Sequence, residues 1–446
     1  MIKSIAYPIA KYVDYYTNQS VREAIKTLDF GENASLHQMT ELRLNAFLSL
    51  LNHAYNTVPY YQKLFQKHNL KLSDFSTLDD IRKLPILTKE DIRSAGHSLQ
   101  STDINNMKYI IARSGGTTGE PIASYVNKKA QALGTYAYLR GLEWMGWKPG
   151  IPIVTLFGGS LHRPEKKSVR IKIREIALGT KFLPAFELTK QNARRYLDTI
   201  SKYSPCVIKG YASSIYNLAL YTQEMNITNI RILNVFSTAE NLPEQWANKI
   251  SEVFNCPVKS YYGCGEINSL GFQVEQSGPY IVPDEHVIIE SQNLTLNGVL
   301  HNNNLLVTSL FNYAQPLIRY QLGDIGEVAA SGIVHPTRSA ITNLIGRTSD
   351  FFLRKDGSTV SPSLAPHIIS KTRLPVTKYQ FIQTDLNNIQ FLYDLEGPDL
   401  TDHQKNEVKS IIHAHISANI NLKFIRTNEF VLSKNGKYRI VISNLL

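Results

Sequence analysis

Apolar residues recur every three or four positions through much of the first hundred residues, which is the spacing of one helix face. The pattern is clearest over residues 37–58, and it predicts a helix that stops at Pro59. Farther along, Thr88 precedes a short helical pattern and Asp91 follows three residues later, as in an N-terminal capping box. We therefore expect the chain to begin with a helical region.

From about residue 108 the pattern changes to short β-rich runs. The runs read KYIIARS, IPIVTLF, CVIKGYA, ILNVFST and VKSYYG, and segments such as residues 188–203 and 241–254 are long enough to form helices between them. Strands that alternate with helices predict a mainly parallel α/β sheet. Residues 280–345 instead favour antiparallel hairpins, in VIIESQNLTLNGVL and IGEVAASGIVH.

The last hundred residues have a pattern of their own. It predicts a strand, a helix, two strands paired around residues 385–388, a helix near residues 401–418 and a further strand, which is enough for a small α+β domain. The expected fold class is α/β. We expect a large N-terminal domain of several subdomains over residues 1–345, with a helical start, an α/β core and an antiparallel part, and a small α+β domain over residues 346–446.

Charge narrows the choice of partners. The chain of 446 residues carries 48 basic and 37 acidic side chains, a net charge of +11. That excess favours anionic partners such as nucleotides, phosphorylated carriers or an anionic membrane surface. Nucleic acid is not expected, because basic and aromatic residues are not interleaved as in a base-stacking platform.

Three cysteines fit a reducing compartment, and no signal peptide or membrane-spanning helix is expected, so the predicted location is cytoplasmic.

Small and polar residues follow four of the predicted strands, at residues 114–116, 158–160, 237–240 and 263–266. Ligands of open α/β sheets bind at the carboxyl ends of strands, so these four segments predict one shared crevice. The Ser/Gly/Thr segment at residues 114–121 suits phosphate oxygens, because it offers backbone N–H groups and hydroxyls. It is not a Walker A loop, and a structural hairpin turn is the alternative interpretation.

Two carboxylates and two basic motifs add candidate chemistry. Glu266 stands after a predicted strand, where it would hold Mg²⁺ beside a triphosphate or would be a solvated glutamate. Asp324 follows a glycine turn, where it would grip a ribose diol or would only cap the turn. The segments at residues 346–350 and 434–439 each carry basic residues, and the second reads equally well as a charged turn.

Together and in this order, these motifs resemble those of the adenylate-forming superfamily, which contains acyl-CoA synthetases, adenylation domains and luciferases. The chain is more closely similar to the phenylacetate-CoA ligase branch, which includes CapK-type proteins of polysaccharide biosynthesis. The resemblance covers nearly the whole chain. The matching segments are residues 113–121 for the phosphate loop, 262–266 for YGxTE, 320–324 for YRTGD, 346–350 for the GRxxD hinge, and Lys437 for the late lysine. It implies a large adenylate-forming domain and a mobile C-terminal lid.

The resemblance also implies roles for individual residues. Lys437, Glu266 and Arg347 would be catalytic, with Glu266 binding Mg²⁺, and Asp350 would be the hinge of the lid. ATP would be bound by Ser114, Gly115, Gly116, Thr117, Thr118, Gly119, Ala239, Glu240, Tyr261, Tyr262, Gly263 and Asp324. The acyl pocket would be lined by Phe157, Gly158, Tyr211, Ser237, Cys264 and Gly265. Among the histidines, only His286 is expected near that pocket.

The implied activity is that of an ATP-dependent, AMP-forming ligase that uses Mg²⁺. It would activate a carboxylic acid as an acyl-adenylate and transfer the acyl group to CoA, or to an amine or hydroxyl on a sugar or amino acid, in capsule or O-antigen assembly. Glu120 and Gly265 depart from the family pattern, the first by adding a negative charge near the polyphosphate and the second by removing a hydroxyl. They favour an alternative, a non-catalytic nucleotide-binding or scaffold protein of a polysaccharide-synthesis complex. Retention of Arg347, Asp324 and Lys437 favours the enzyme.

The stretch over residues 163–181 holds seven Lys or Arg residues against two Glu residues. One interpretation is a solvated helix or hairpin face. The other is a contact for an anionic partner, such as the phosphates of CoA, a lipid diphosphate-linked glycan or the membrane surface beneath one. In the second case Lys166, Lys167, Arg170 and Lys172 would make peripheral contact with the membrane or bind the acceptor.

Overall fold

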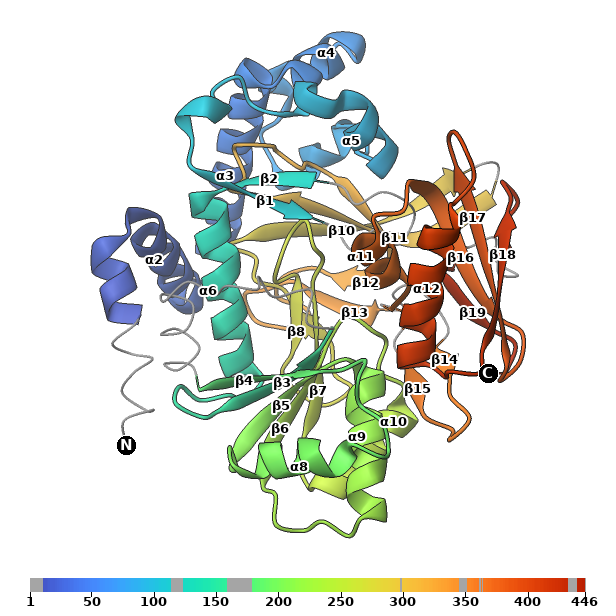
Figure 1. Cartoon of the computed structure of the whole chain (residues 1–446). Coiled ribbons are helices and arrows are strands. Elements are labelled where there is room, and N and C mark those ends of the chain that lie inside the picture. Colours follow the sequence, from blue (N-terminus) through green and yellow to red (C-terminus); the bar gives the residue numbers. More distant parts are fainter. Residues whose placement is uncertain are drawn as a thin grey trace.

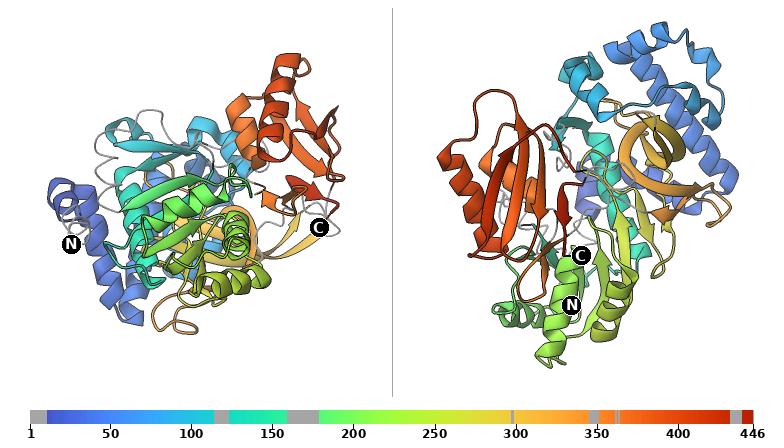
Figure 2. Two further views of the ribbon diagram at one scale, coloured as in Figure 1. Left: turned by 60° about the horizontal axis from the view of Figure 1, so that its bottom comes forward. Right: turned by 90° about the vertical axis from the view of Figure 1, so that its right-hand side faces the viewer.

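The computed structural model of the protein consists of a large body and a smaller C-terminal part that packs against one side of it (Figures 1 and 2). The structure describes residues 11–113, 123–158, 179–296, 299–344, 351–360, 362, 364–431 and 439–445. The α/β fold class expected from the sequence is confirmed. The expected boundary between residues 345 and 346 lies outside the described residues and stays a prediction.

Helices form the N-terminal layer, as predicted. The helix expected over residues 37–58 spans Leu36–Thr57, and Ser35 and Gln38 close a capping box at its start. The capping box predicted at Thr88 is also present, since the Thr88 hydroxyl accepts from the backbone N–H of Asp91 at 3.1 Å. The helices are α2 (Gln19–Asn33), α3 (Leu36–Thr57), α4 (Pro59–Lys67) and α5 (Lys89–Ala95). Within the described residues, every helix is too short or too polar to cross a bilayer.

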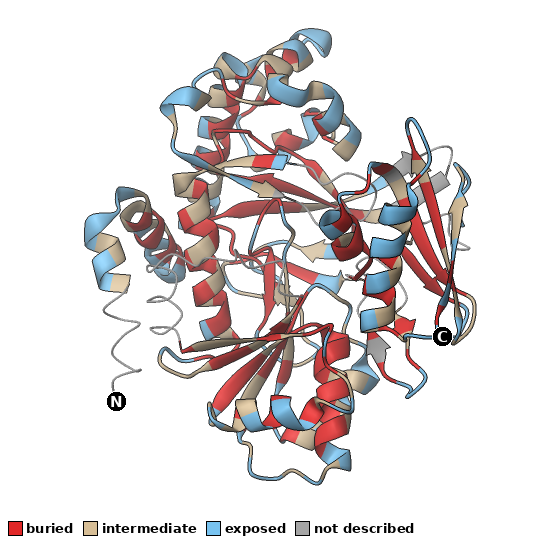
Figure 3. Cartoon of the chain, in the orientation of Figure 1, coloured by how far each residue is buried: buried red, intermediate tan, exposed pale blue. Residues whose placement is uncertain are grey.

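A parallel sheet forms the centre of the body and continues into an antiparallel part, giving eleven strands in the order β10-β11-β12-β13-β9-β8-β7-β6-β5-β3-β4. The parallel strands are β3 (Ile153–Phe157), β4 (Thr180–Pro184), β5 (Cys206–Gly210), β6 (Ile232–Ser237) and β7 (Val258–Tyr262). Apolar side chains on one face pack against α8 (Ala193–Ser201), α9 (Ala212–Glu224) and α10 (Glu244–Phe254), and those on the other face against α6 (Lys128–Trp144). Figure 3 shows these faces buried.

The first predicted strand does not join this sheet, so that expectation is wrong. Its residues form β1 (Tyr109–Arg113), which pairs antiparallel with β2 (Ala123–Asn127) in a hairpin of two strands. Nine residues separate the two strands, fewer than the crossover of a dozen or more that a parallel return needs, so β1 pairs with the next strand along the chain as an antiparallel hairpin. The predicted phosphate loop at residues 114–119 falls between them, outside the described residues.

The antiparallel part of the sheet confirms one predicted hairpin and corrects another. The strands are β8 (Gly271–Gln273), β9 (Tyr280–Ile281), β10 (Val287–Leu296), β11 (Val299–Ser309), β12 (Tyr320–Ala329) and β13 (Ala340–Leu344). The hairpin predicted over residues 287–300 is β10 with β11. The partner of β12 begins at Ala340 rather than near Ile333, because the residues between form turns that carry Ser331 and Arg338 into buried polar contacts.

The C-terminal part has the predicted α+β pattern. Its four-stranded sheet has the order β18-β17-β16-β19, and two helices pack against it. The elements are β14 (Phe352–Leu353), β15 (Thr359–Val360), α11 (Leu364–Thr372), β16 (Val376–Gln383), β17 (Asn388–Leu395), α12 (Asp402–His415), β18 (Asn421–Arg426) and β19 (Val441–Ser443).

An arginine joins the C-terminal part to the body. The guanidinium of Arg354 donates to the backbone carbonyls of Phe186 at 3.2 Å and Leu188 at 2.9 Å, both in the body, and to that of His415 at 2.8 Å. The Phe186 ring also contacts the rings of His367 and His415, with centroids 5.2 and 5.9 Å apart. Apolar packing is therefore continuous between the two parts.

A buried carboxylate fastens the helical layer to the sheet. Glu285 is fully buried just before β10, and it accepts two hydrogen bonds from Arg140 of α6, both at 2.9 Å, and two from Arg338, at 2.6 and 2.7 Å. Arg140 also donates to the carbonyl of Leu28 and Arg338 to that of Gly31, so both reach the end of α2. A Cβ at Gly31 would lie 1.9 Å from the Glu285 carboxylate, so the close approach requires glycine.

The two guanidinium groups decide the ionisation of Glu285. Burial alone raises the pKa of a carboxyl group, but here the charges and hydrogen bonds of Arg140 and Arg338 outweigh burial and lower the pKa of Glu285 to about 2. The carboxylate therefore stays charged across the physiological range. Removing it would leave two partly or fully buried cations with only the half-exposed carboxylate of Glu32, 3.5 Å from Arg140 and 3.2 Å from Arg338, as a common counter-ion.

We predict that Glu285→Gln lowers the free energy of unfolding by about 3–5 kcal/mol, because the arginines lose the charge that compensates their burial. Urea denaturation followed by circular dichroism measures the change. The matched control is Glu252→Gln, which breaks an exposed pair with Lys249 and should cost less than about 1 kcal/mol. Equal losses for the two variants would contradict the role of Glu285.

We also predict that Glu285 contributes to acid denaturation. The unfolded chain protonates this carboxyl near its ordinary pKa of 4.5, whereas the folded chain keeps it ionised down to about 2. Its contribution is therefore complete above pH 4.5 and is lost as the pH falls towards 2, a change of about 3 kcal/mol. Urea midpoints measured between pH 6 and 2 should fall more steeply for the wild type than for Glu285→Gln. Parallel curves would show that Glu285 carries none of this dependence.

Candidate active site

The loop after β6 holds two predicted ATP-binding residues at the carboxyl end of the parallel sheet. Ala239 is exposed and has a φ of 66°, so the chain turns sharply there. The next residue, Glu240, accepts hydrogen bonds from the backbone N–H of Ser213 at 2.9 Å and from its hydroxyl at 3.2 Å. Ser213 lies in the first turn of α9, where a carboxylate is favoured by the helix dipole. The loop is thereby fixed to the neighbouring strand-to-helix turn.

Two tyrosine–carboxylate hydrogen bonds join the most distinctive predicted motifs. The Tyr262 hydroxyl donates to Asp324 Oδ2 at 2.6 Å, and the Tyr320 hydroxyl donates to Glu266 Oε1 at 2.7 Å. Each motif therefore contains one tyrosine and, four residues later, one carboxylate. The tyrosine of each motif donates to the carboxylate of the other motif. Both carboxylates are mostly buried, with 7% of Glu266 and 8% of Asp324 exposed. The structure thus brings together residues that lie about sixty positions apart in the sequence.

Glu266 has the chemistry that a magnesium site needs. One of its carboxylate oxygens is held by Tyr320, and the other has no hydrogen-bond partner among the residues that the structure describes. Mg²⁺ prefers hard anionic oxygens and usually takes only one or two carboxylates beside water and phosphate. The residues present therefore fit Mg²⁺ coordinated through Glu266.

Cys264 stabilises its own turn. Its thiol donates to the carbonyl of Ile267 at 3.2 Å and accepts from the N–H of the same residue at 3.3 Å. Burial, and after it the nearby charge of Glu266, raises the pKa of Cys264 well above its ordinary value. The thiol is therefore protonated and holds the chain in place beside Glu266. The next predicted pocket residue, Gly265, is exposed, as is the predicted ATP-binding residue Gly263.

Aromatic packing surrounds other residues predicted for the acyl pocket. The Tyr211 ring stacks on Phe157, with centroids 4.3 Å apart, and on Phe186 at 5.7 Å. Only 3% of Tyr211 is exposed, and Phe186, on which it stacks, contacts His367 and His415 of the C-terminal part. Ser237 is also buried, and its hydroxyl has no hydrogen-bond partner within the described chain. Gly158, at the end of β3, is buried as well. The pocket role of these residues stays a prediction.

Helix α6 contributes residues that the sequence analysis missed. Tyr138 packs edge-on against Tyr261, with ring centroids 5.5 Å apart, and accepts from Lys209 Nζ at 2.6 Å. One turn earlier, the Gly134 carbonyl accepts from the Ser269 hydroxyl at 2.9 Å, beside the loop that carries Glu266. The available signal was the single lysine in the apolar strand CVIKG. A lone charge inside a buried strand is uncommon and indicates a specific partner.

His286 lies against the same face of α6. Its Nε2 is 3.0 Å from the carbonyl oxygen of Asn268, and a Cβ at Gly134 would lie 3.5 Å from that nitrogen. Burial lowers the pKa of His286 to about 4, so the imidazole is neutral at pH 7. His286 therefore supports the segment after Glu266 as an uncharged group.

Several predicted residues lie outside the described part of the chain. They are the phosphate-loop residues 114–119, Arg347, Asp350, Lys437 and the basic residues Lys166, Lys167, Arg170 and Lys172. Their roles stay predictions. The described members, by contrast, come from β3, β6, β7 and β12 and from the loops that follow β3, β5, β6 and β7.

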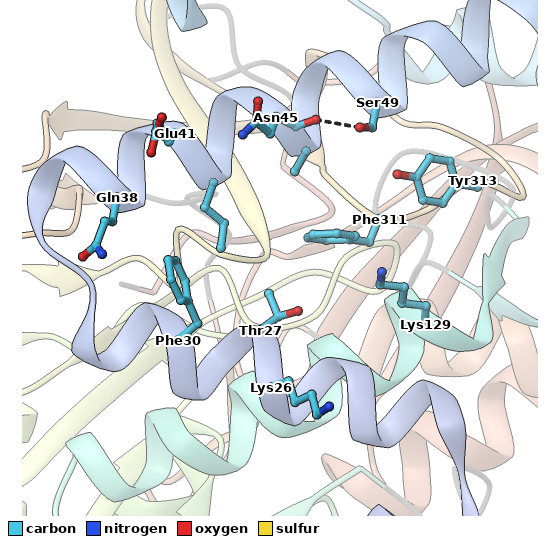
Figure 4. Close-up of a pocket in the computed structure, with 12 residues that line it drawn as sticks. Lys26, Thr27, Phe30, Gln38, Glu41, Asn45, Ser49, Lys129, Phe311 and Tyr313 are labelled. Atoms are coloured by element: carbon cyan, nitrogen blue, oxygen red, sulfur yellow. Dashed lines mark hydrogen bonds between the residues drawn. The ribbon is translucent and has the colours of Figure 1, made fainter.

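An open cavity of about 610 Å³ lies elsewhere, between α2 and α3 (Figure 4). Phe30, Phe311 and Tyr313 line it, and Lys129 Nζ stands 4.9 Å above the Phe311 ring. None of the predicted site residues that the structure describes lines this cavity. It is therefore separate from the ends of the parallel strands.

Comparisons with known proteins agree with this arrangement. Residues 352–444 match the CapK C-terminal domain family. The chain is 25% identical over 422 residues to protein CapK of Staphylococcus aureus, covering 92% of this chain and 90% of that protein. It is also 25% identical over 349 residues to phenylacetate-coenzyme A ligase of Pseudomonas putida, covering 75% of this chain and 76% of the ligase.

A solved structure has the same fold. The structure of 2-hydroxyisobutyryl-CoA ligase in complex with 2-HIB-AMP and CoA superposes with a TM-score of 0.62 at 15% identity. The superposition covers 94% of this chain and 92% of the ligase, so the likeness includes both the body and the C-terminal part. The match to protein CapK spans nearly the whole chain, and the match to the CapK C-terminal domain family falls on the α+β part described above. The chain is thus similar along nearly its whole length to protein CapK and over three quarters of it to phenylacetate-coenzyme A ligase, and its C-terminal part matches the CapK C-terminal domain family.

Proposed function

We propose that the protein is an AMP-forming acid–CoA ligase. In the first half-reaction, a carboxylate oxygen of the acid attacks the α-phosphorus of ATP and pyrophosphate leaves. In the second half-reaction, the CoA thiol attacks the acyl carbonyl, AMP leaves and a thioester forms. The observation that carries the proposal is the pair of hydrogen bonds that brings Glu266 and Asp324 together through Tyr320 and Tyr262.

The first half-reaction requires positive charge and hydrogen-bond donors, because two anions meet and negative charge grows on the phosphoryl oxygens. In the proposal, Asp324 accepts from the ribose hydroxyls, and Ala239, Glu240 and Tyr261 lie beside the adenine. Lys437 and Arg347 provide positive charge at the phosphate. Bound to Glu266, Mg²⁺ would neutralise part of the polyphosphate charge.

The second half-reaction requires the C-terminal part to change position, since one site serves two steps. The relatives named as phenylacetate-CoA ligases, and the CoA complex of the ligase with the same fold, support CoA as acceptor. An amine or hydroxyl on a sugar or amino acid is the alternative acceptor. The likeness to protein CapK supports a place in capsule or O-antigen assembly, as an analogy.

Exchange of labelled pyrophosphate into ATP tests the first half-reaction directly. We expect exchange that depends on a carboxylic acid, measured across a panel of acids, and CoA-dependent AMP release with the acids that exchange. Binding of ATP without exchange for any acid would contradict the proposal and favour a non-catalytic nucleotide-binding protein. Pyrophosphate exchange without AMP release on addition of CoA would support the first half-reaction and would contradict only the choice of CoA as acceptor.

We predict that Lys437→Ala slows pyrophosphate exchange by about 100-fold or more, through loss of charge stabilisation at the α-phosphate. Transfer from a supplied acyl-adenylate to the acceptor should be slowed much less, because Lys437 is assigned to the first orientation of the lid. Lys434→Ala, three residues away in the same stretch, is the matched control. Equal losses in the two half-reactions would show that the assignment of Lys437 is wrong.

We predict that Asp324→Ala weakens ATP binding by about 10- to 100-fold, because the ribose hydroxyls lose a charged acceptor. Isothermal titration calorimetry measures the affinity, and circular dichroism checks the fold. Tyr262→Phe, which removes the donor to Asp324 and leaves the carboxylate in place, should weaken ATP binding less than Asp324→Ala does. Unchanged affinity in Asp324→Ala would mean that Asp324 serves only the turn.

A further inference from the structure

Lys209 lies near the carboxyl end of the parallel sheet, on the face that α6 covers. In the register of the sheet it stands beside Thr155 of β3 and Phe236 of β6. The next residue, Gly210, ends the strand, so Lys209 lies one residue, or about 3 Å, before the edge where the predicted site residues gather. Its side chain runs between the sheet and Tyr138 of α6.

This lysine has no anionic partner in the described part of the chain. Its ammonium group donates one hydrogen bond, to the Tyr138 hydroxyl at 2.6 Å, and no carboxylate of a described residue lies within 4.0 Å of it. An ammonium group has three donors, so two remain for another acceptor. A cation held off the surface without a counter-ion costs free energy, which a bound anion would offset.

Two other partly buried lysines of the body are matched to acceptors. Lys129 pairs with Glu23 at 3.4 Å, and Lys259 donates to the backbone carbonyl of Met145 at 2.9 Å. Lys209 is matched only to a phenol, and burial keeps the neighbouring phenols neutral, because it raises the pKa values of Tyr138 and Tyr261. The surroundings of Lys209 therefore supply hydroxyl groups and ring surfaces but no negative charge.

The rings of Tyr138 and Tyr261 stand side by side next to this ammonium group. Apolar ring faces with a cation at one end suit a short carbon chain that ends in a carboxylate. The reacting carboxyl group would lie at the strand edge, near the loop that carries Glu266. The other end of such a substrate would reach Lys209, which lies one residue before the end of β5.

We propose that Lys209 determines substrate specificity by binding a second carboxylate, so that the acid activated is a short dicarboxylic acid. The inference rests on the proposed ligase function. Tyr138 is then a positioning residue, because its hydroxyl fixes the ammonium group.

The test compares dicarboxylates with their monoamides, which have the same length and shape but carry one charge fewer. Pyrophosphate exchange is measured with malonate, succinate and glutarate and with the monoamide of each. For the wild type we expect at least one diacid to exceed its monoamide in kcat/KM by about 100-fold. In Lys209→Met the ratio for that pair should fall to near one, and Lys209→Arg should retain part of it. Tyr138→Phe should raise the KM for the diacid several-fold with little change in kcat.

A second measurement separates this inference from the ligase function. Binding of the same acids is followed by calorimetry without ATP, on the wild type and Lys209→Met, after circular dichroism shows that both are folded. Diacid binding that Lys209→Met abolishes supports the inference even if no acid supports exchange, in which case only the ligase function fails. Wild-type preference for the monoamides, equal ratios in the wild type and Lys209→Met, or the absence of diacid binding in both measurements would overturn it.

Discussion

The buried carboxylate of Glu285 is the contact on which the relative placement of the layers depends. It lies where the end of α2, the outer face of α6 and the start of β10 meet, and its two arginine partners come from different parts of the chain. Because both arginines also donate to carbonyls at the end of α2, one charge fixes three elements. The inner face of α6, with Gly134 and Tyr138, is thereby held against the strand ends.

The candidate site is built from neutral donors that hold charged acceptors. Phenol hydroxyls orient the carboxylates of Glu266 and Asp324, and they do so without cancelling either charge. An arginine or lysine in their place would compete with a metal ion or a ribose for the same oxygens. Phenols at the end of β7 and the start of β12 therefore keep both carboxylates ordered.

Local sequence signals predicted the elements well, and long-range contacts limited the rest. Capping at Thr88 and four of the five parallel strands between Ile153 and Tyr262 follow from spacing and composition within a few residues, whereas β4 was not predicted. The sequence did not reveal that β1 leaves the main sheet, because that depends on the nine-residue return to β2. The motifs around Glu266 and Asp324 were recognisable from the sequence, but their crossed hydrogen bonds were not. The single lysine of the strand CVIKG was visible in the sequence, but only the fold reveals that no carboxylate of a described residue lies beside Lys209.

Arg354 attaches the C-terminal part through main-chain oxygens of Phe186 and Leu188 rather than through an acidic side chain. Every residue type supplies such an oxygen, so mutations at these two positions can accumulate during evolution without removing the acceptors. The bond also joins a charge to a dipole, and dissolved ions weaken it less than they weaken a pair of exposed opposite charges. Attachment of the C-terminal part at this point should therefore depend little on ionic strength.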